Sequence, residues 1–277
     1  MKPFFAPFAL VFALLVATSA LAEKADVPIT MQVAGRNVVV TPPEAACSYD
    51  RANPVDAQIL YYLEKGLKDY NQLVLAFADC KDLDATRTGK QQTTGDYGQI
   101  MFPLSDKDML DLTRTELVSK LTDIYRTNTG AFDEGLQKGT EILKSITSDT
   151  LKINNSRVLG VIRSDPDLVQ IGMMQSIQTP EKAVLVLGVI TATKLGVPVT
   201  INLYHPSSGA DNDKALHELS IRSAAYARRL IALNPDTALP HADERREDSK
   251  HILGLVLGAL LIVGAVIGLC YKKRKAP

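Results

Sequence analysis

The sequence predicts an α+β protein, in which an antiparallel sheet with packed helices is followed by one C-terminal transmembrane helix. Four strand-like runs follow one another between residues 156 and 204, and amphipathic helical patterns precede and follow them. Residues 252–271 form an apolar run without a charged side chain. Consecutive strands joined by short turns usually pair with one another, so the four runs predict an antiparallel meander on which the helices pack.

The first part of the predicted domain alternates strands and helices. Residues 29–40 alternate apolar and polar side chains around a central Ala-Gly turn, which is typical of a hairpin. Asn53 and Pro54 fit the N-cap and the first position of a helix with an apolar stripe. After this helix come a strand, QLVLAFADC, which ends at Cys80; a long polar surface loop, residues 81–98; and a further strand, YGQIMFPL.

The rest of the domain predicts two helices, the four strands and a closing helix. The helical patterns cover residues 106–127 and 131–147, and the closing amphipathic helix covers residues 211–233. Turn-forming residues separate the four strands, which are SRVLGVIR, LVQIGMMQSI, KAVLVLGVITATKL and VPVTINLY. We therefore expect one extracytoplasmic domain at residues 23–234 and a polar tether to the membrane at residues 235–250.

The two ends of the chain predict its compartment. Residues 1–22 begin with Lys2, continue through an apolar run and close on small residues, which is typical of a cleaved signal peptide; the alternative is an uncleaved anchor. Residues 251–271 predict a transmembrane helix of the ~20 residues that a bilayer requires. The basic tail, residues 272–277, should stay in the cytoplasm by the positive-inside rule. We expect a single-pass type I protein in a bacterial inner membrane, facing the periplasm. The alternative is a eukaryotic endoplasmic-reticulum membrane, where Arg274 and Lys275 would resemble a retrieval signal.

The charge of the expected exported domain limits its partners. Although the whole chain has a formal net charge of zero, the part between the two apolar segments has 26 basic and 31 acidic residues, a net charge of −5. A nucleic-acid surface requires a basic face, so nucleic acid is not expected as a partner. The expected partners are membrane lipid and a protein, bound either by the domain or through the transmembrane helix.

The cysteines predict one disulfide. Cys47 and Cys80 are the two cysteines of the expected exported domain, and Cys270 lies inside the expected span. In an exported protein such a pair favours a disulfide over a metal or redox site, and the alternative is two buried free thiols. Closing this loop would stabilise the fold by about 3 to 4 kcal/mol in the chain-entropy description.

The order of the elements also resembles a known fold. A first strand ends in TPPEAACSY and is followed by a helix, paired strands and a closing helix. This order is similar to that of the PsbP-like α/β fold, and to uncharacterised bacterial envelope proteins that join such a domain to a terminal span. The resemblance covers residues 29–234. It implies a binding or assembly module, and it brings no catalytic residues with it.

The sequence carries no complete motif for catalysis, for a cofactor or for a metal, so we expect no cofactor and no metal and assign no catalytic residues. His217 and Glu218 begin like the H-E-x-x-H metal motif, but Ile221 stands where the second histidine belongs. No P-loop, G-x-G-x-x-G or G-x-S-x-G pattern is present. Several aspartates lack the glycine and glutamate spacing of a calcium loop: Asp82, Asp84, Asp106, Asp108 and Asp111.

One polar stretch is a candidate ligand-binding turn, formed by Tyr204, His205, Ser207 and Ser208. The last strand brings Tyr204 and His205 to its end, and a helix begins shortly afterwards with Asp211 or Asn212 as its cap. Helix starts attract anions, although aspartates already supply negative charge at this one. The simpler alternative is a capped strand-to-helix turn that binds no ligand.

Two functions are compatible with these observations. The first is a membrane-anchored extracytoplasmic module that binds a partner protein or an envelope component. The second is a membrane-tethered enzyme of a type that the sequence does not identify, with a hydrolase as the most plausible kind. The absence of catalytic motifs favours the first function, and a pocket with converging Asp, His and Ser side chains would favour the second.

The expected span carries a testable packing surface. Gly254, Gly258, Ala265 and Gly268 lie within roughly 40° of one direction on an α-helix, and small residues on one stripe let two helix backbones approach closely in lipid. We expect this segment to self-associate or to pack on a partner's helix. Gly258→Ile and Gly268→Ile should weaken the signal of a transmembrane association assay. Equal signals from the native segment and both variants would leave the span as a simple anchor.

Overall fold

The computed structural model describes residues 28–67, 70–90, 95–104, 107–127, 152–178 and 182–235, with separate positions between 135 and 145. The expected signal peptide, tether, transmembrane helix and basic tail lie outside the described residues. Most of the helix expected at residues 131–147 also lies outside them. Among the helices of the described part, none is both long enough and apolar enough to cross a membrane.

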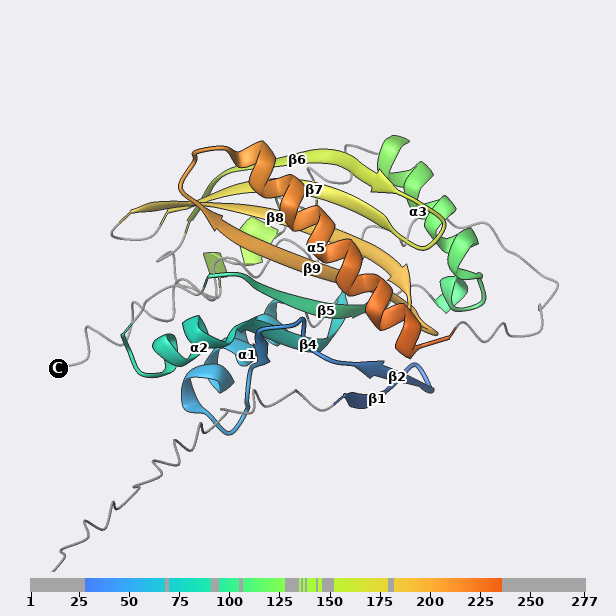
Figure 1. Ribbon diagram of the computed structural model, residues 1–277, viewed down its shortest axis with the longest axis horizontal. Coiled ribbons are helices and arrows are strands. Elements are labelled where there is room, and N and C mark those ends of the chain that lie inside the picture. Colours follow the sequence, from blue (N-terminus) through green and yellow to red (C-terminus); the bar gives the residue numbers. More distant parts are fainter. Residues whose placement is uncertain are drawn as a thin grey trace, which may run out of the picture.

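The centre of the protein is a seven-stranded antiparallel sheet with the order β3-β4-β5-β9-β8-β7-β6 (Figure 1). Strands β6 to β9 pair consecutively, which confirms the predicted meander. The α+β fold class is confirmed as well. The strands are β3 (Ala46–Ser48), β4 (Asn71–Asp79), β5 (Tyr97–Pro103), β6 (Lys152–Ser164), β7 (Val169–Gln178), β8 (Ala183–Lys194) and β9 (Pro198–Ser207).

Strands β5 and β9 join the two parts of the chain. β9 is the last strand in sequence, yet it pairs along its free edge with β5, so that Tyr97 lies opposite Tyr204 and Met101 lies opposite Thr200. This pairing turns the N-terminal strands and the C-terminal meander into one sheet. It was not predicted, because the alternation of side chains along a strand does not specify which edge a distant strand will occupy.

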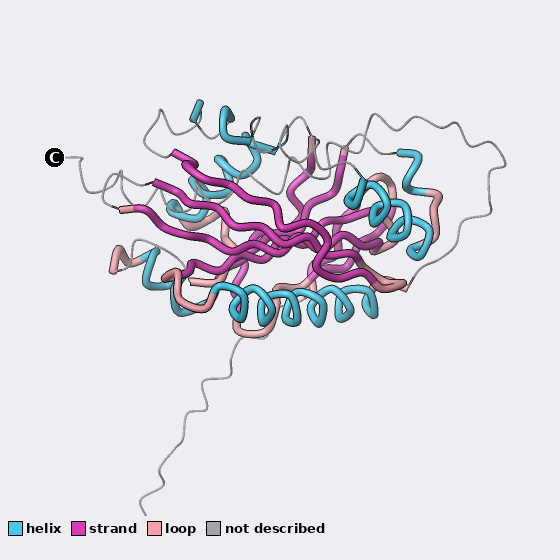
Figure 2. Tube along the Cα trace, turned by 90° about the horizontal axis from the view of Figure 1, so that it is seen from above, coloured by secondary structure: helices cyan, strands magenta, loops and turns pink. Residues whose placement is uncertain are grey.

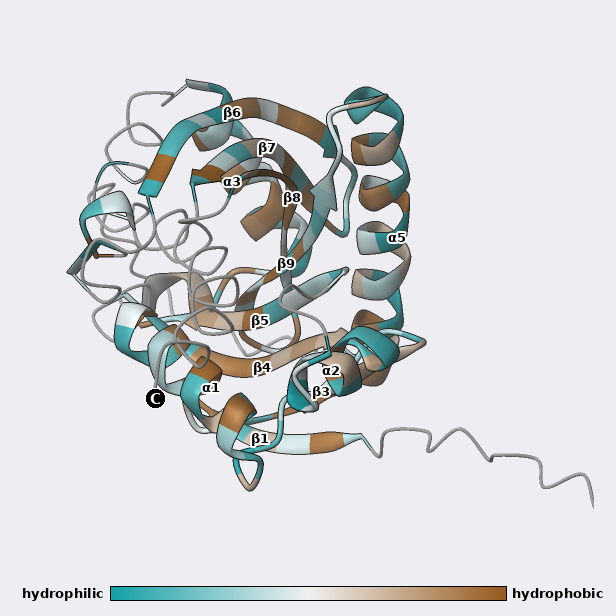
Figure 3. Ribbon diagram, turned by 90° about the vertical axis from the view of Figure 1, so that its left-hand side faces the viewer, coloured by the Kyte–Doolittle hydropathy of each residue, from teal (hydrophilic) through white to brown (hydrophobic). Residues whose placement is uncertain are grey.

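Helices cover both faces of this sheet (Figure 2). The long helix α5 (Asn212–Leu233) lies along one face, which it shares with the hairpin of β1 (Ile29–Val33) and β2 (Arg36–Val40). Helices α1 (Pro54–Leu67) and α3 (Arg114–Thr127) pack on the other face. The strands follow an arc, with α5 outside it and α3 inside it (Figure 3). Each face therefore has its own apolar core.

A buried polar network fixes the position of α5 on the sheet. The side-chain amide of Gln170 in β7 donates to the hydroxyl of Thr191 (3.0 Å) and to the backbone carbonyl of Ser220 (3.1 Å). The Ser220 hydroxyl donates back to the Gln170 side-chain oxygen at 2.6 Å, and the hydroxyls of Thr191 and Ser223 lie 2.6 Å apart. Because buried polar groups are costly without partners, sliding α5 along the sheet would be strongly unfavourable.

Several local expectations hold. The hairpin, the closing helix and the helix at Pro54 are present, and the Asn53 side chain accepts a hydrogen bond from the Val55 N–H (2.9 Å), as an N-cap does. His217 is exposed on α5, as a plain surface histidine would be.

Three local expectations are wrong. The chain after β4 is not all loop, because it forms helix α2 (Cys80–Arg87), whose start the Asp79 carboxylate caps through the N–H groups of Lys81 and Asp82. The segment between the predicted hairpin and the helix at Pro54, which was expected only to connect them, contains the three-residue strand β3 with Cys47. The helix expected at residues 106–127 is divided into a 3₁₀ turn (Lys107–Leu110) and α3. A capping box between Thr113 and Glu116 starts α3 anew.

We expect Gln170→Ala to destabilise the domain by about 1 to 3 kcal/mol, because it leaves the Ser220 hydroxyl without its buried partner and removes one of the two partners of the Thr191 hydroxyl. Gln32→Ala is the matched control, since Gln32 is exposed and bonds to Asn37 on the surface. Urea unfolding of the full chain, followed by circular dichroism, measures the difference. Equal midpoints for the two variants would contradict the role of the network.

Candidate binding cleft

A cleft of about 570 Å³ lies between α5 and the end of the sheet formed by β3, β4, β5 and β9. We call it the α5 cleft. One wall is the face of α5 that carries Leu219, Arg222, Ala225, Tyr226 and Arg229. The opposite wall is the segment 43–46, which connects β2 to β3. Its volume falls in the range of about 300 to 1,000 Å³ that is usual for pockets binding small molecules.

The floor of the α5 cleft is aromatic and apolar. Phe77 of β4 meets Tyr226 edge to face, with ring centroids 5.6 Å apart, and Leu203 of β9 lies beside them. Tyr97 and Tyr204 also border the cleft, but their stacked rings, with centroids 5.0 Å apart, belong to the core on the other face of the sheet and are not part of the floor. Such a floor offers dispersion contacts and edge-to-face packing to an apolar ligand.

Gly98 lets this floor form. A Cβ atom at this position would stand 2.4 Å from the backbone oxygen of Asn202 and 2.7 Å from the Phe77 ring. Real Cβ atoms do not approach other atoms so closely, so a larger residue would push β9 or Phe77 away. Glycine is therefore required for the close approach of β5, β9 and the floor ring.

An ionic cluster lies at one end of the cleft, just before β5. One Asp96 oxygen lies 2.6 Å from Nδ1 of His205, and the other oxygen accepts a hydrogen bond from Arg222 of α5. Both oxygens of Asp96 are thus engaged. The cluster ties the middle of α5 to the end of β9 and the start of β5, and it largely neutralises the charge of Arg222.

Arg229 differs from Arg222 in its hydrogen-bond partners. Its Nη2 donates to the Pro42 carbonyl at 3.0 Å and to the Thr41 hydroxyl at 3.3 Å, and both of these acceptors are neutral. No carboxylate of the described residues forms an ion pair with it. Burial raises the pKa of the Tyr226 phenol, and the charge of Arg229 acts in the opposite direction. Arg229 is exposed on α5 and lines the cleft with a charge that no carboxylate of the described residues pairs.

The predicted disulfide supports the second wall. Cys47 and Cys80 are bonded, with an S–S distance of 2.02 Å, and Cys47 directly follows the wall residue Ala46. The backbone N–H of Cys80 also donates to the Ala45 carbonyl (3.1 Å). The disulfide thus fastens the wall segment to the start of α2.

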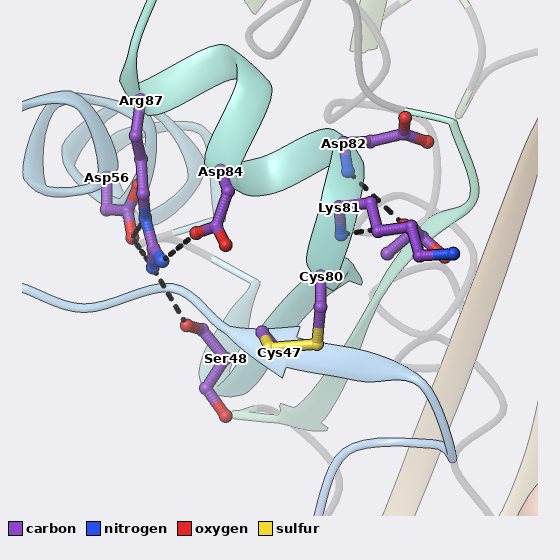
Figure 4. Close-up of a disulfide and its surroundings, with 9 residues drawn as sticks. Cys47, Ser48, Asp56, Cys80, Lys81, Asp82, Asp84 and Arg87 are labelled. Atoms are coloured by element: carbon purple, nitrogen blue, oxygen red, sulfur yellow. Dashed lines mark hydrogen bonds and ion pairs between the residues drawn. A yellow bond between two sulfur atoms is a disulfide. The ribbon is translucent and has the colours of Figure 1, made fainter. Parts of the chain in front are cut away.

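An ion pair holds the neighbouring elements (Figure 4). Arg87 of α2 reaches the fully buried carboxylate of Asp56 in α1 at 2.5 Å, and it also donates to the Ser48 carbonyl in β3 at 3.5 Å. The hydrogen bond to Asp56 raises the pKa of the Arg87 guanidinium. Leaving the buried Asp56 carboxylate unpaired would be costly, so α1, α2 and β3 are held as a unit behind the wall.

The structure brings only part of the predicted ligand-binding turn to the cleft. Tyr204 lines it, and His205 contacts the cleft through Asp96. Ser207 instead donates to the side-chain oxygen of Asn212 at 2.6 Å, which stabilises the start of α5, and Ser208 follows in the connection. Asp211 occupies the N-cap position without a side-chain cap bond. Ligand binding by this turn stays a prediction.

Most of the cleft was not predicted from the sequence. The predicted site residues did not include Phe77, Asp96, Arg222, Tyr226 or Arg229. One signal was present: positions 219, 222, 226 and 229 recur at intervals of three and four, so that they share one side of α5. Leucine, tyrosine and two arginines on one helix face make a mixed surface. Nothing in the sequence shows that strand ends and a disulfide-held segment lie opposite it.

The described part of the chain contains no cluster of side chains suited to a metal ion. Within it, no three side chains of the His, Cys, Asp or Glu type gather closely enough to hold a metal ion. The helix-packing residues expected in the span lie outside the described residues.

Comparison with known proteins gives little information about function. Neither a protein-family model nor a curated protein matches this chain. Among solved structures, the Ran-binding protein Mog1p of Saccharomyces cerevisiae is similar, with a TM-score of 0.31 and 11% sequence identity. The match covers 76% of this chain and 93% of that chain. A similarity with this TM-score assigns neither a fold family nor a function to the chain. The resemblance to the PsbP-like fold stays a prediction.

The buried tyrosines predict how the domain responds to alkali. Burial raises the pKa of the Tyr97, Tyr204 and Tyr226 phenols above the usual value. The folded state keeps these protons where the unfolded chain releases them. These three tyrosines should therefore add no pH dependence to the free energy of unfolding below about pH 10, and they should lower it as the pH rises further.

Phenolate absorbance after a rapid jump to high pH tests this expectation. Tyr97, Tyr204 and Tyr226 should be among the tyrosines that ionise slowly, together with unfolding. Tyr226→Phe should remove one slow equivalent, and Tyr61→Phe, at an exposed position, should remove none. If all tyrosines ionised at once in a chain that stays folded, the expectation would be wrong.

Proposed function

We propose that this chain is a membrane-anchored extracytoplasmic binding module that uses the α5 cleft to bind its partner. The observation that carries the proposal is the cleft itself, which combines an aromatic floor with charged groups at its rim. Pockets of this size, largely apolar and with a few placed polar groups, are the usual form of a ligand site. Its walls are fastened by a disulfide and by two ion clusters, as a preformed site requires.

The proposed location follows from the sequence and is supported by the disulfide. The signal peptide, the transmembrane helix and the basic tail expected from the sequence would leave the domain outside the cytoplasm. A disulfide between the two cysteines of the domain fits an oxidising compartment. The proposed membrane is the bacterial inner membrane, with the domain in the periplasm.

The Asp96–His205 pair is the observation that would favour the alternative, a hydrolase. In acyl-transfer enzymes a carboxylate orients a histidine, and the histidine takes a proton from a nucleophile within hydrogen-bonding distance. Within the described residues, His205 hydrogen-bonds to Asp96, and no serine, threonine or cysteine is its second partner. Ser207 is directed to Asn212 instead. The arrangement therefore supports binding more than catalysis.

Site-specific photo-crosslinking of the full chain in its native membrane tests this function. A photoreactive side chain is placed at Ala225, which is exposed and lines the α5 cleft, or at Ile221, which is exposed on α5 and does not line it. We expect a specific adduct, seen as an added mass on the purified chain, at Ala225 and not at Ile221. Adducts at both positions to the same extent, or at neither, would contradict a binding role for the cleft.

A further inference from the structure

We propose that the α5 cleft binds a small organic anion, one carboxylate-type head group on an apolar body, and that Arg229 is its anchor. This inference rests on the proposed function, because it names the class of ligand that the same cleft would take.

The first argument is the unused hydrogen-bonding capacity of Arg229. A guanidinium has five N–H donors, and the bonds that Arg229 makes to Thr41 and Pro42 both leave from Nη2. The N–H groups on Nε and Nη1 have no acceptor in the described part of the chain. The guanidinium is also held in place, because its two bonds connect α5 to the segment that enters the opposite wall. An oriented, always charged donor group of this kind is well suited to a carboxylate.

The second argument comes from the other charges of the cleft. Arg222 is already matched by Asp96, which it shares with His205, so the additional positive charge lies at the Arg229 end. Asp79 uses one oxygen to cap α2. Glu44, on the opposite wall, is exposed and its carboxylate is the like charge that an incoming anion would meet. Asp79 keeps its negative charge while it caps α2, so the charge pattern orients the head group toward Arg229 and away from Glu44 and Asp79.

The third argument concerns the body of the ligand. Tyr226, one helical turn before Arg229, forms the floor with Phe77 and donates its hydroxyl proton to the Thr41 carbonyl at 2.6 Å. Because that hydroxyl is engaged, Tyr226 presents its ring to the cleft and no free donor. Leu203 and Leu219 extend this apolar surface. A ligand anchored at Arg229 would therefore lay an aromatic or aliphatic group on the floor.

The test compares two probes of nearly equal shape, naphthalene-1-acetate and the uncharged naphthalene-1-acetamide. Each is titrated into the full-length chain in lipid nanodiscs, with empty nanodiscs as the blank. We expect the acetate to bind at least about tenfold more tightly than the acetamide, since a hydrogen bond to a charged group is worth this much. Arg229→Gln should remove the difference.

Two further variants keep the test independent of folding defects. Arg228→Gln is the matched control, since Arg228 is the neighbouring arginine of α5 and pairs with Asp165 instead of lining the cleft; it should keep the preference for the acetate. Glu44→Gln should tighten acetate binding about twofold by removing a like charge at the exposed rim.

Each outcome decides a separate point. Equal binding of acetate and acetamide would overturn the assignment of an anion while leaving the cleft as a binding site. Binding of neither probe by the folded native chain would overturn the small-ligand inference, and the crosslinking at Ala225 would still decide the proposed function. A preference for the acetate that persists in Arg229→Gln would overturn the role of Arg229.

Discussion

The rest of the structure depends on the pairing of β5 with β9. This contact joins the N-terminal strands to the C-terminal meander, and it requires Gly98, because any Cβ there would meet the backbone of β9. The same contact places Leu203 next to Phe77 in the floor of the α5 cleft, and it stacks Tyr97 on Tyr204 in the core on the other face. Without this pairing the chain would have two small sheets, and each would leave an apolar face uncovered.

The two faces of the sheet are specified in different ways. Under α5, the amide of Gln170 and the hydroxyls of Thr191, Ser220 and Ser223 satisfy one another, so the helix has one preferred position. On the opposite face, Gln175 is buried with neither atom of its amide hydrogen-bonded within the described residues. A satisfied network defines position sharply, whereas an unsatisfied group costs stability. The position of α5 on its face of the sheet is therefore defined more sharply than the packing on the opposite face, and α5 supplies one wall of the cleft.

The second wall of the cleft, the segment 43–46, is held by links to neighbouring elements. The position of the segment 43–46 is fixed by the disulfide at Cys47 and by the hydrogen bonds of Arg229 and Tyr226 to residues 41 and 42. The buried pair of Asp56 and Arg87 then connects the disulfide region to α1 and α2. The shape of the cleft thus depends on covalent and ionic links between elements that are distant in sequence.

The sequence by itself determined the local elements of the domain and one long-range link. Alternation gave the hairpin and the four strands of the meander, apolar periodicity gave α1 and α5, and the exported context gave the Cys47–Cys80 pair. It failed at α2, where a capping aspartate starts a helix with little apolar periodicity, and at residues 107–127, where a capping box divides a continuous pattern. Only the tertiary structure decided that β9 lies beside β5 and that Asp96 meets both His205 and Arg222. It also decided that Arg229 bonds to Thr41 and Pro42, which lie some 185 residues earlier in the chain. The physical reason is that propensity, capping and periodicity act over a few neighbouring residues, whereas a cleft is made by side chains whose separation along the chain leaves no local pattern.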